Sequence, residues 1–154
     1  DYWIAVQVDG DGQHPADQIR LLVKPLLEKK ADIVVGSRFL GGGDYRPSFA
    51  RGAGMTIFSK LVSAIIGERV SDTTSGFRAS GRRCIEFFCR QYPDDYPEVE
   101  TLVLLHKGGF SIIETPVRMS GRTGGRSSIT PVKSLYYMVK VLLAISVDLL
   151  KKTR

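Results

Sequence analysis

Two short apolar segments separated by a helical segment constrain the fold of this chain more than any other feature. Residues 3–8 and 31–36 are apolar and rich in β-branched side chains, whereas residues 14–27 repeat apolar side chains at helical spacing. A strand, a helix and a second strand of this length form a βαβ unit, in which the two strands run parallel. We therefore predict an α/β fold, with the helix kinked or broken near Lys24 because Pro25 removes an intrahelical hydrogen bond.

The rest of the chain continues this alternation of helices and strands. The glycine-rich residues 40–44 predict a mobile loop, and the polar residues 71–79 predict a series of turns. We find no linker long enough to separate two domains. The further elements that we expect are a helix that ends at Gly67, helices over about 81–90 and 97–107, and a strand over 110–117.

Charge and cysteine content bear on the partners and the compartment of the protein. The net charge is +6, but residues 1–110 are nearly neutral, while residues 111–154 carry eight basic and two acidic side chains. A neutral body argues against a general polyanion-binding domain, so we expect no nucleic-acid partner. Cys84 and Cys89 form neither a zinc pattern nor a disulfide framework, which is typical of a reduced, cytoplasmic protein.

An acidic, glycine-rich turn, Asp-Gly-Asp-Gly, follows the first predicted strand at residues 9–12. We expect this strand to be buried and parallel, and open α/β sheets bind ligands at the carboxyl ends of such strands. Asp9 and Asp11 are two residues apart, so both carboxylates can face one cation, and hard oxygen ligands suit Mg²⁺ or Mn²⁺ shared with a diphosphate. The alternative is an acidic turn that only precedes a helix N-terminus.

Five short passages in a fixed order carry a family resemblance that spans nearly the whole chain. They are residues 8–15, 33–39, 72–79, 114–117 and 122–128. In these passages the chain resembles the family 2 glycosyltransferases of the GT-A type, and most closely the polyprenyl-phosphate sugar transferases related to dolichyl-phosphate mannose synthase. The resemblance implies a Rossmann-like GT-A sheet with flanking helices. It also implies an inverting, metal-dependent transfer of a sugar from a nucleotide-diphosphate sugar to a polyprenyl phosphate.

The same resemblance assigns roles to the acidic turn. Asp9 would contact the sugar nucleotide, Asp11 would bind the divalent metal that bridges its diphosphate, and Gln13 would be a further metal ligand. A nucleotide diphosphate leaving group gains negative charge as the sugar–phosphate bond breaks. A bound Mg²⁺ or Mn²⁺ stabilises that charge, which fits the oxygen-rich side chains of the turn.

Three arginines are implied to hold the acceptor phosphate. The family uses arginines at the places of Arg38, Arg51 and Arg122 for this purpose. An Arg fork suits the task because it matches phosphate oxygens with two parallel hydrogen bonds. Arg38 ends the second predicted strand, Arg51 precedes the second predicted helix, and Arg122 lies in a glycine-rich loop. The plainer interpretation of each is a solvated surface charge.

Further residues are implied to surround the two phosphate groups. Arg126 and Ser127 share the loop of Arg122 and could close over the diphosphate. Asp72 and the turn that contains Ser75 are expected to line the acceptor side. These expectations rest on the resemblance.

Glu98 is a candidate general base at the start of a predicted helix. An acceptor hydroxyl must lose its proton as the sugar migrates, whereas a phosphate monoester is already ionised and needs no base. Glu98 lies where hydroxyl-directed relatives carry their acidic base, but the helix dipole also explains an acid at this place. A sugar hydroxyl of a growing polysaccharide therefore stays open as an alternative acceptor.

The basic C-terminal region predicts contact with a membrane surface. Residues 131–152 read as a long helix with a basic stripe and a broad apolar face, and the longest run without a charge is too short to span a bilayer. Such a helix suits the membrane interface, although packing against the rest of the protein explains it equally well. We expect residues 129–154 to hold the protein at the cytoplasmic face of a membrane. A non-catalytic module that binds anionic lipid is a further alternative.

Family members begin with segments that bind the nucleotide base and ribose, and nothing in this chain resembles them. We therefore expect residues 1–128 to be the C-terminal part of a catalytic domain that is inactive in isolation. The strand before the acidic turn would then have an unprotected edge, which invites self-association.

Overall fold

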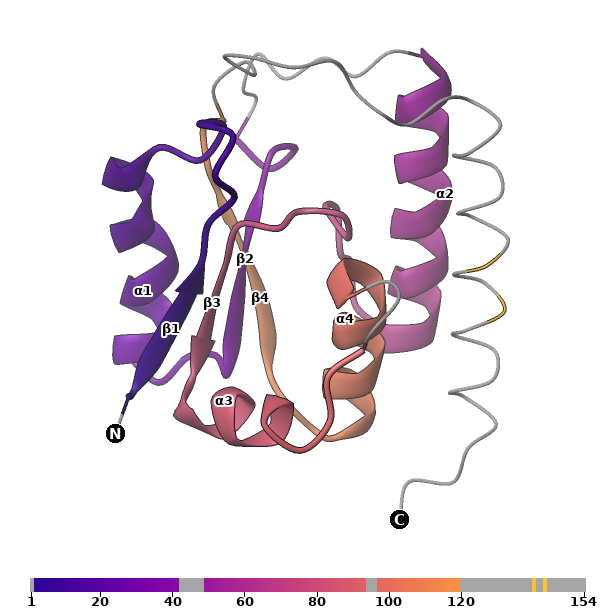
Figure 1. Cartoon of the computed structure of the whole chain (residues 1–154). Helices are drawn as coiled ribbons and strands as arrows, with labels where there is room; N and C mark the ends of the chain where they lie inside the picture. The colour runs from indigo at the N-terminus through magenta and orange to yellow at the C-terminus, as the bar shows by residue number, and fades with distance from the viewer. Residues whose placement is uncertain (1, 42–48, 94–96, 120–139, 141–142, 144–154) are drawn as a thin grey trace.

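A mixed four-stranded sheet forms the centre of the molecule (Figure 1). The computed structural model describes residues 2–41, 49–93 and 97–119, together with residues 140 and 143. The strands are β1 (Ile4–Gln7), β2 (Ile33–Ser37), β3 (Arg78–Gly81) and β4 (Ile112–Pro116). Their order is β1-β3-β2-β4, with β3 antiparallel to both neighbours and β4 parallel to β2. The predicted α/β class is confirmed, and the architecture is consistent with part of a Rossmann-like GT-A domain.

β1 and β2 run in the same direction, as the sequence predicts, but β3 lies between them. Residues 71–79 were predicted to form turns and β3 was not predicted, because Arg78, Ser80 and Gly81 lack the apolar alternation of a strand. The expectation that the strand before the acidic turn is buried and parallel to its neighbour is wrong. Within the described sheet β1 is an edge strand, antiparallel to β3, whose residues alternate between half-buried and exposed.

The helices lie close to their predicted positions. A 3-10 turn over Ala16–Gln18 precedes α1 (Ile19–Leu27). α2 (Phe49–Ile66) ends just before Gly67, whose φ of +73° suits a glycine at a helix end. A kink or a break was predicted near Lys24, but α1 continues without a break to Leu27, because Pro25 lies in its last turn and removes only one hydrogen bond there. The helices are α1 (Ile19–Leu27), α2 (Phe49–Ile66), α3 (Arg82–Phe88) and α4 (Pro97–Lys107).

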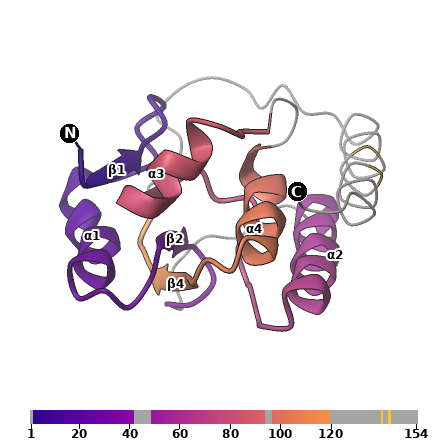
Figure 2. The ribbon, with the colours of Figure 1, turned by 90° about the horizontal axis from the view of Figure 1, so that it is seen from below.

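Helices cover both faces of the sheet (Figures 1 and 2). α1 lies on one face, α3 and α4 lie on the other, and α2 packs beside α4. The buried side chain of Val34 in β2 packs with Leu22 and Leu26 of α1. The next residue, Val35, belongs to the core shared with α2 and α4. β2 is buried along its whole length, which explains its continuous apolar sequence.

The structure tests the predictions about the cysteines and about membrane contact only in part. Cys84 is buried in α3 and Cys89 is exposed just after it, and both are free. In the part of the chain that the structure describes, every helix is too short or too polar to cross a bilayer. The expected loop at 40–44, the glycine-rich loop of Arg122 and the expected helix at 131–152 lie largely or wholly outside the described residues.

Candidate active site

The acidic turn, Arg38 and the loop that carries Asp72 converge on one edge of the sheet. β1 and β2 run in the same direction, so the acidic turn after β1 and Arg38 after β2 lie at the same edge. β3 is antiparallel to both, which brings the preceding residues 71–77 to that edge as well. The register makes this explicit, because Gln7 and Val35 are both paired with Arg78, the first residue of β3.

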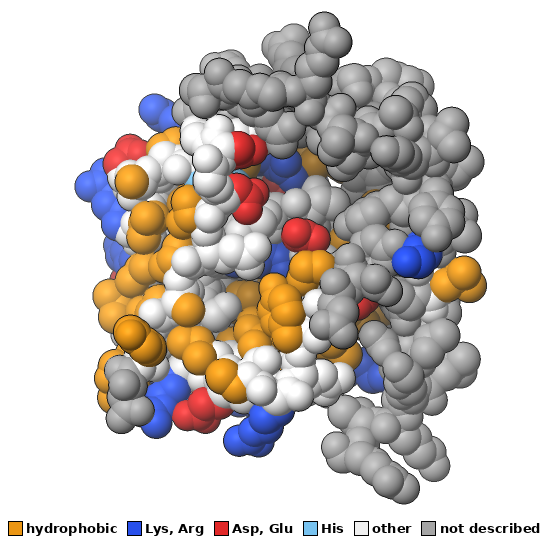
Figure 3. Space-filling model, viewed as in Figure 1, with side chains coloured by type: hydrophobic (Ala, Val, Ile, Leu, Met, Phe, Trp, Pro, Cys, Tyr) orange, Lys and Arg blue, Asp and Glu red, His pale blue; other side chains and the backbone are white. Residues whose placement is uncertain are grey.

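The side chain of Asp11 closes the acidic turn. The backbone N–H of Gln13 donates a hydrogen bond of 3.0 Å to Oδ1 of Asp11, and Gly12 between them has a φ of +76°, which favours glycine. The Asp9 side chain is 52% exposed. Acidic side chains gather on this part of the surface (Figure 3). The turn therefore presents carboxylate oxygens to solvent at the end of β1.

His14 holds the start of this turn. The backbone N–H of Asp9 donates a hydrogen bond of 3.0 Å to Nδ1 of His14. The imidazole stacks on the Phe77 ring with a centroid distance of 4.7 Å and an interplanar angle of 11°. Burial lowers the pKa of His14 below its ordinary value, although Asp9 and Asp11 act to raise it; the positive charge of Arg38 lowers it further. His14 is thus neutral at pH 7, with its proton on Nε2, because Nδ1 accepts.

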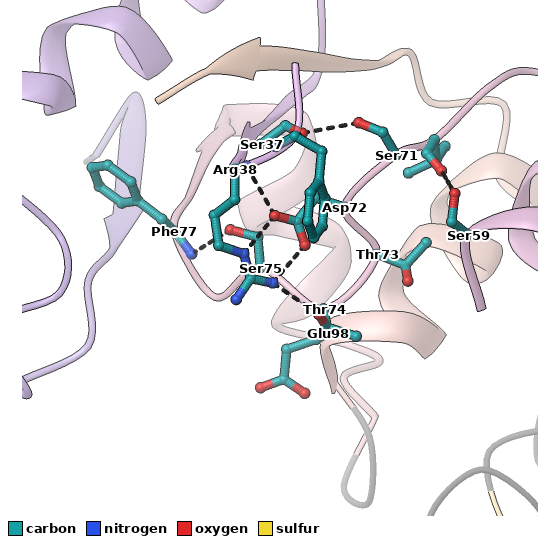
Figure 4. A network of polar contacts seen from close by, with 12 residues as sticks. Ser37, Arg38, Ser59, Ser71, Asp72, Thr73, Thr74, Ser75, Phe77 and Glu98 are labelled. Carbon is teal, nitrogen blue, oxygen red and sulfur yellow. Dashed lines mark hydrogen bonds and ion pairs between the residues drawn. The ribbon is translucent and has the colours of Figure 1, made fainter. Parts of the chain in front are cut away.

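Arg38 and Asp72 form a two-pronged ion pair (Figure 4). The Nε and Nη2 atoms of Arg38 donate to Oδ2 and Oδ1 of Asp72 at 2.7 and 2.6 Å. The backbone N–H of Arg38 also donates to Oδ2 at 3.0 Å, and Nη2 donates to the Thr74 hydroxyl at 2.9 Å. The Asp72 side chain is fully buried and that of Arg38 is 14% exposed. Two residues that were predicted separately as acceptor ligands are therefore bound to each other.

Glu114 fixes the loop that carries Asp72. Its carboxylate accepts hydrogen bonds from the Ser71 backbone at 2.7 Å, the Ser71 hydroxyl at 2.8 Å and the Asp72 backbone at 2.7 Å. Ser71 also shares a hydrogen bond with Ser37 at the end of β2. Glu114 was not among the predicted site residues. The available signal was an acid within the apolar strand β4, where a carboxylate requires polar partners.

Arg78 joins the loop before β3 to the first turn of α4. Its guanidinium donates to the Ser75 carbonyl at 2.7 Å, the Thr73 carbonyl at 3.2 Å and the Thr101 hydroxyl at 2.7 Å. It also donates to the main-chain carbonyl of Glu98, the candidate base. Arg78 is only 5% exposed, so this contact fixes the position of the Glu98 backbone from inside the protein.

The donor set of the acidic turn fits Mg²⁺ or Mn²⁺ in kind. These cations are held in proteins by one or two carboxylates, and the remaining positions are filled by water and substrate phosphate. Asp9 and Asp11 supply two carboxylates, and Gly76 packs so closely on Asp9 that a Cβ there would lie 3.1 Å from Oδ2. Among the residues that the structure describes, no cluster of three or more His, Cys, Asp or Glu side chains is arranged to bind a metal.

Other predicted site residues have different outcomes. Ser75 is 1% exposed and its hydroxyl accepts a hydrogen bond from the Phe77 N–H at 3.3 Å, while Phe77 is fully buried. Arg51 lies within the first turn of α2 instead of before it, since the helix begins at Phe49. The loop residues expected to bind phosphate, namely Arg122, Arg126 and Ser127, lie outside the described residues.

Comparisons with known proteins bear on the family resemblance. No protein-family model matches the chain. It is 28% identical over 118 residues to the UDP-N-acetylglucosamine–dolichyl-phosphate N-acetylglucosaminyltransferase of Methanococcus voltae, which covers 75% of the chain and 47% of the relative. It is 26% identical over 147 residues to the polyprenol monophosphomannose synthase of Mycolicibacterium smegmatis, which covers 91% of the chain and 54% of the relative.

A third relative is the dolichyl-phosphate hexose transferase of Haloferax volcanii, 28% identical over 122 residues, with 79% of the chain and 52% of the relative covered. The chain thus spans about half the length of these curated relatives. The resemblance read from the five passages is confirmed: these three curated homologues are dolichyl-phosphate and polyprenol-phosphate sugar transferases.

Proposed function

We propose that this chain is part of a glycosyltransferase that moves a sugar from a nucleotide-diphosphate sugar to a polyprenyl phosphate, with inversion at the sugar carbon. The observation that carries the proposal is the convergence of the acidic turn and the Arg38–Asp72 pair on one sheet edge. This arrangement occurs in a chain whose relatives are named as transferases to dolichyl and polyprenol phosphates.

In this proposal the acidic turn faces the donor. Asp11, together with Asp9 and Gln13, would hold Mg²⁺ or Mn²⁺, which stabilises the negative charge that develops on the leaving diphosphate. The hydrogen bond from the Gln13 backbone to Asp11 already orients that carboxylate before any ligand binds. Such preorganisation lowers the cost of reaching the transition state, because little rearrangement is needed there.

Arg38 would face the acceptor phosphate. Its guanidinium is held by Asp72 and Thr74, so little side-chain freedom remains to be lost when a phosphate binds. Asp72 offsets the charge of Arg38, however, and a net attraction for a phosphate then requires further cations. Arg51 and Arg122 are the groups that we propose for this role, whereas Arg126 and Ser127 would close over the diphosphate of the donor.

The acceptor decides whether Glu98 takes part in the chemistry. A polyprenyl phosphate is ionised at neutral pH, so no group has to remove a proton from it. Replacing Glu98 with Gln should then change the transfer rate little. A collapse of the rate in this variant would contradict the phosphate acceptor and support a sugar hydroxyl, with Glu98 as the base.

The test is a transfer assay with the full-length gene product. Radiolabelled nucleotide sugars are incubated with a short polyprenyl phosphate in detergent, with Mn²⁺ or with a chelator. We expect sugar to enter the organic phase only with the metal, and we expect the 154-residue chain alone to be inactive. Failure of the full-length protein with every common nucleotide sugar would contradict the proposal. Sedimentation with anionic liposomes tests the proposed peripheral contact of residues 129–154 with the cytoplasmic face of the membrane.

A further inference from the structure

The imidazole of His14 rests on a rigid platform. It stacks on Phe77, which is fully buried, and only 4% of the His14 side chain is exposed. The Phe77 carbonyl accepts a hydrogen bond of 2.8 Å from the Gly36 backbone in β2. A Cβ at Gly36 would lie 3.1 Å from this carbonyl oxygen, so the two segments are in close contact. The Phe77 ring is therefore fixed by the core of the sheet, and the His14 imidazole stacked on it moves little relative to β2.

From this platform the ring contacts Asp9 in two ways: Nδ1 binds the Asp9 backbone, and Nε2 lies 3.8 Å from Oδ2 of the Asp9 carboxylate. Nδ1 of His14 accepts the hydrogen bond from the Asp9 N–H at 3.0 Å, across five residues of chain. At the other end of the turn, the Gln13 N–H donates a hydrogen bond to Oδ1 of Asp11. The Asp9 carboxylate itself packs against the Cα of Gly76, which leaves no room for a larger residue without displacement. The two ends of the turn are thus held by separate contacts.

We propose that His14 is a positioning residue, whose acceptor atom Nδ1 and stacked ring hold the Asp9 backbone so that the Asp9 and Asp11 carboxylates converge on one divalent cation. This inference rests on the proposed function, because it names the group that orders the cation-binding turn. It assigns the two features of His14 to separate tasks: the stack fixes the ring, and Nδ1 fixes the turn.

Two pairs of proteins separate these tasks, and the first pair is the wild type and His14→Phe. His14→Phe keeps a ring that can stack on Phe77 but lacks an acceptor at Nδ1. The second pair loses the ring in both members: His14→Asn places its carbonyl oxygen where Nδ1 lies, whereas His14→Gln places its amide near Nε2. The full-length variants are compared with the wild type by the Mn²⁺ dissociation constant from electron paramagnetic resonance. The kcat and the KM for the acceptor are measured alongside, together with the thermal midpoint.

We expect His14→Phe to weaken Mn²⁺ binding about tenfold or more, and to lower kcat with little change in the acceptor KM, because the loss falls on the groups that hold the metal ligands. His14→Asn should bind Mn²⁺ more tightly than His14→Gln, since it restores an acceptor for the Asp9 N–H. A merely structural role would instead lower the thermal midpoint of the Asn and Gln variants equally, with the same Mn²⁺ affinity in both.

Wild-type affinity in a folded His14→Phe protein would overturn the proposal. If that variant does not fold, the Asn and Gln pair decides, and an affinity in Gln equal to or above that in Asn overturns it. Absence of Mn²⁺ binding by the wild type would also overturn it. A wild type that binds Mn²⁺ but transfers no sugar contradicts the proposed function and leaves the order of affinities to judge His14.

Discussion

The buried carboxylate of Asp72 accepts hydrogen bonds from Nε and Nη2 of Arg38, at 2.7 and 2.6 Å, across 34 residues of chain. This pair joins the end of β2 to the loop that leads into β3. Because the Asp72 side chain is fully buried, its charge is tolerated only while the guanidinium and the backbone N–H of Arg38 compensate for it. The Arg38–Asp72 pair therefore stabilises the fold, in addition to being a candidate binding group.

Asp72→Asn should destabilise the protein by about 3 kcal/mol, because it leaves the largely buried Arg38 without its carboxylate. Urea unfolding followed by circular dichroism measures the loss. Asp17→Asn, at an exposed position before α1, is the matched control and should leave the unfolding free energy nearly unchanged. Equal stability of the two variants would contradict a stabilising role of the Arg38–Asp72 pair.

Glu114→Gln should cost about 1–3 kcal/mol of unfolding free energy, because the amide nitrogen of Gln cannot accept the hydrogen bonds that converge on the carboxylate from Ser71 and Asp72. The matched control is Glu86→Gln in α3, where the glutamate is 54% exposed and pairs with Arg82 on the surface. We expect little change in the control. The same free-energy loss in both proteins would show that the Glu114 contacts do not stabilise the loop.

Cys89 should react with maleimide in the native protein, whereas Cys84 should react only after unfolding. Burial raises the pKa of the Cys84 thiol to about 12, so almost no nucleophilic thiolate forms at neutral pH, and the side chain is inaccessible. Mass spectrometry counts the labels. Cys89→Ser should abolish native labelling, and rapid labelling of Cys84 in the folded variant would contradict the burial.

Asp11→Asn should slow sugar transfer by about a hundredfold or more, because the proposed cation loses a charged ligand and stabilises the leaving diphosphate less well. The initial rate at saturating nucleotide sugar is the measurement, with Asp17→Asn as the control of equal charge change. Binding to anionic liposomes should be the same in both variants. Liposome binding without metal, combined with no transfer by the wild type, would instead favour the lipid-binding module.

The local elements could be predicted well, because their signals lie within a few residues. Helical spacing placed α4 at 97–107 and a helix that ends before Gly67, and both positions are confirmed. β2 and β4 follow from their apolar runs. The errors in the sheet share one origin: β3 carries Arg78, Ser80 and Gly81, so neither its existence nor its place between β1 and β2 is visible in a local pattern.

The sequence by itself determined the elements, the acidic turn and the family resemblance, since propensity, turn glycines and side-chain spacing act over short distances. Only the tertiary structure decided that Arg38 binds Asp72, that Glu114 anchors the loop that carries Asp72, and that His14 stacks on Phe77 beside Asp9. These contacts join residues far apart in the chain. They depend on the order and direction of the strands, which is set by burying the apolar faces of α1, α3 and α4 against one sheet.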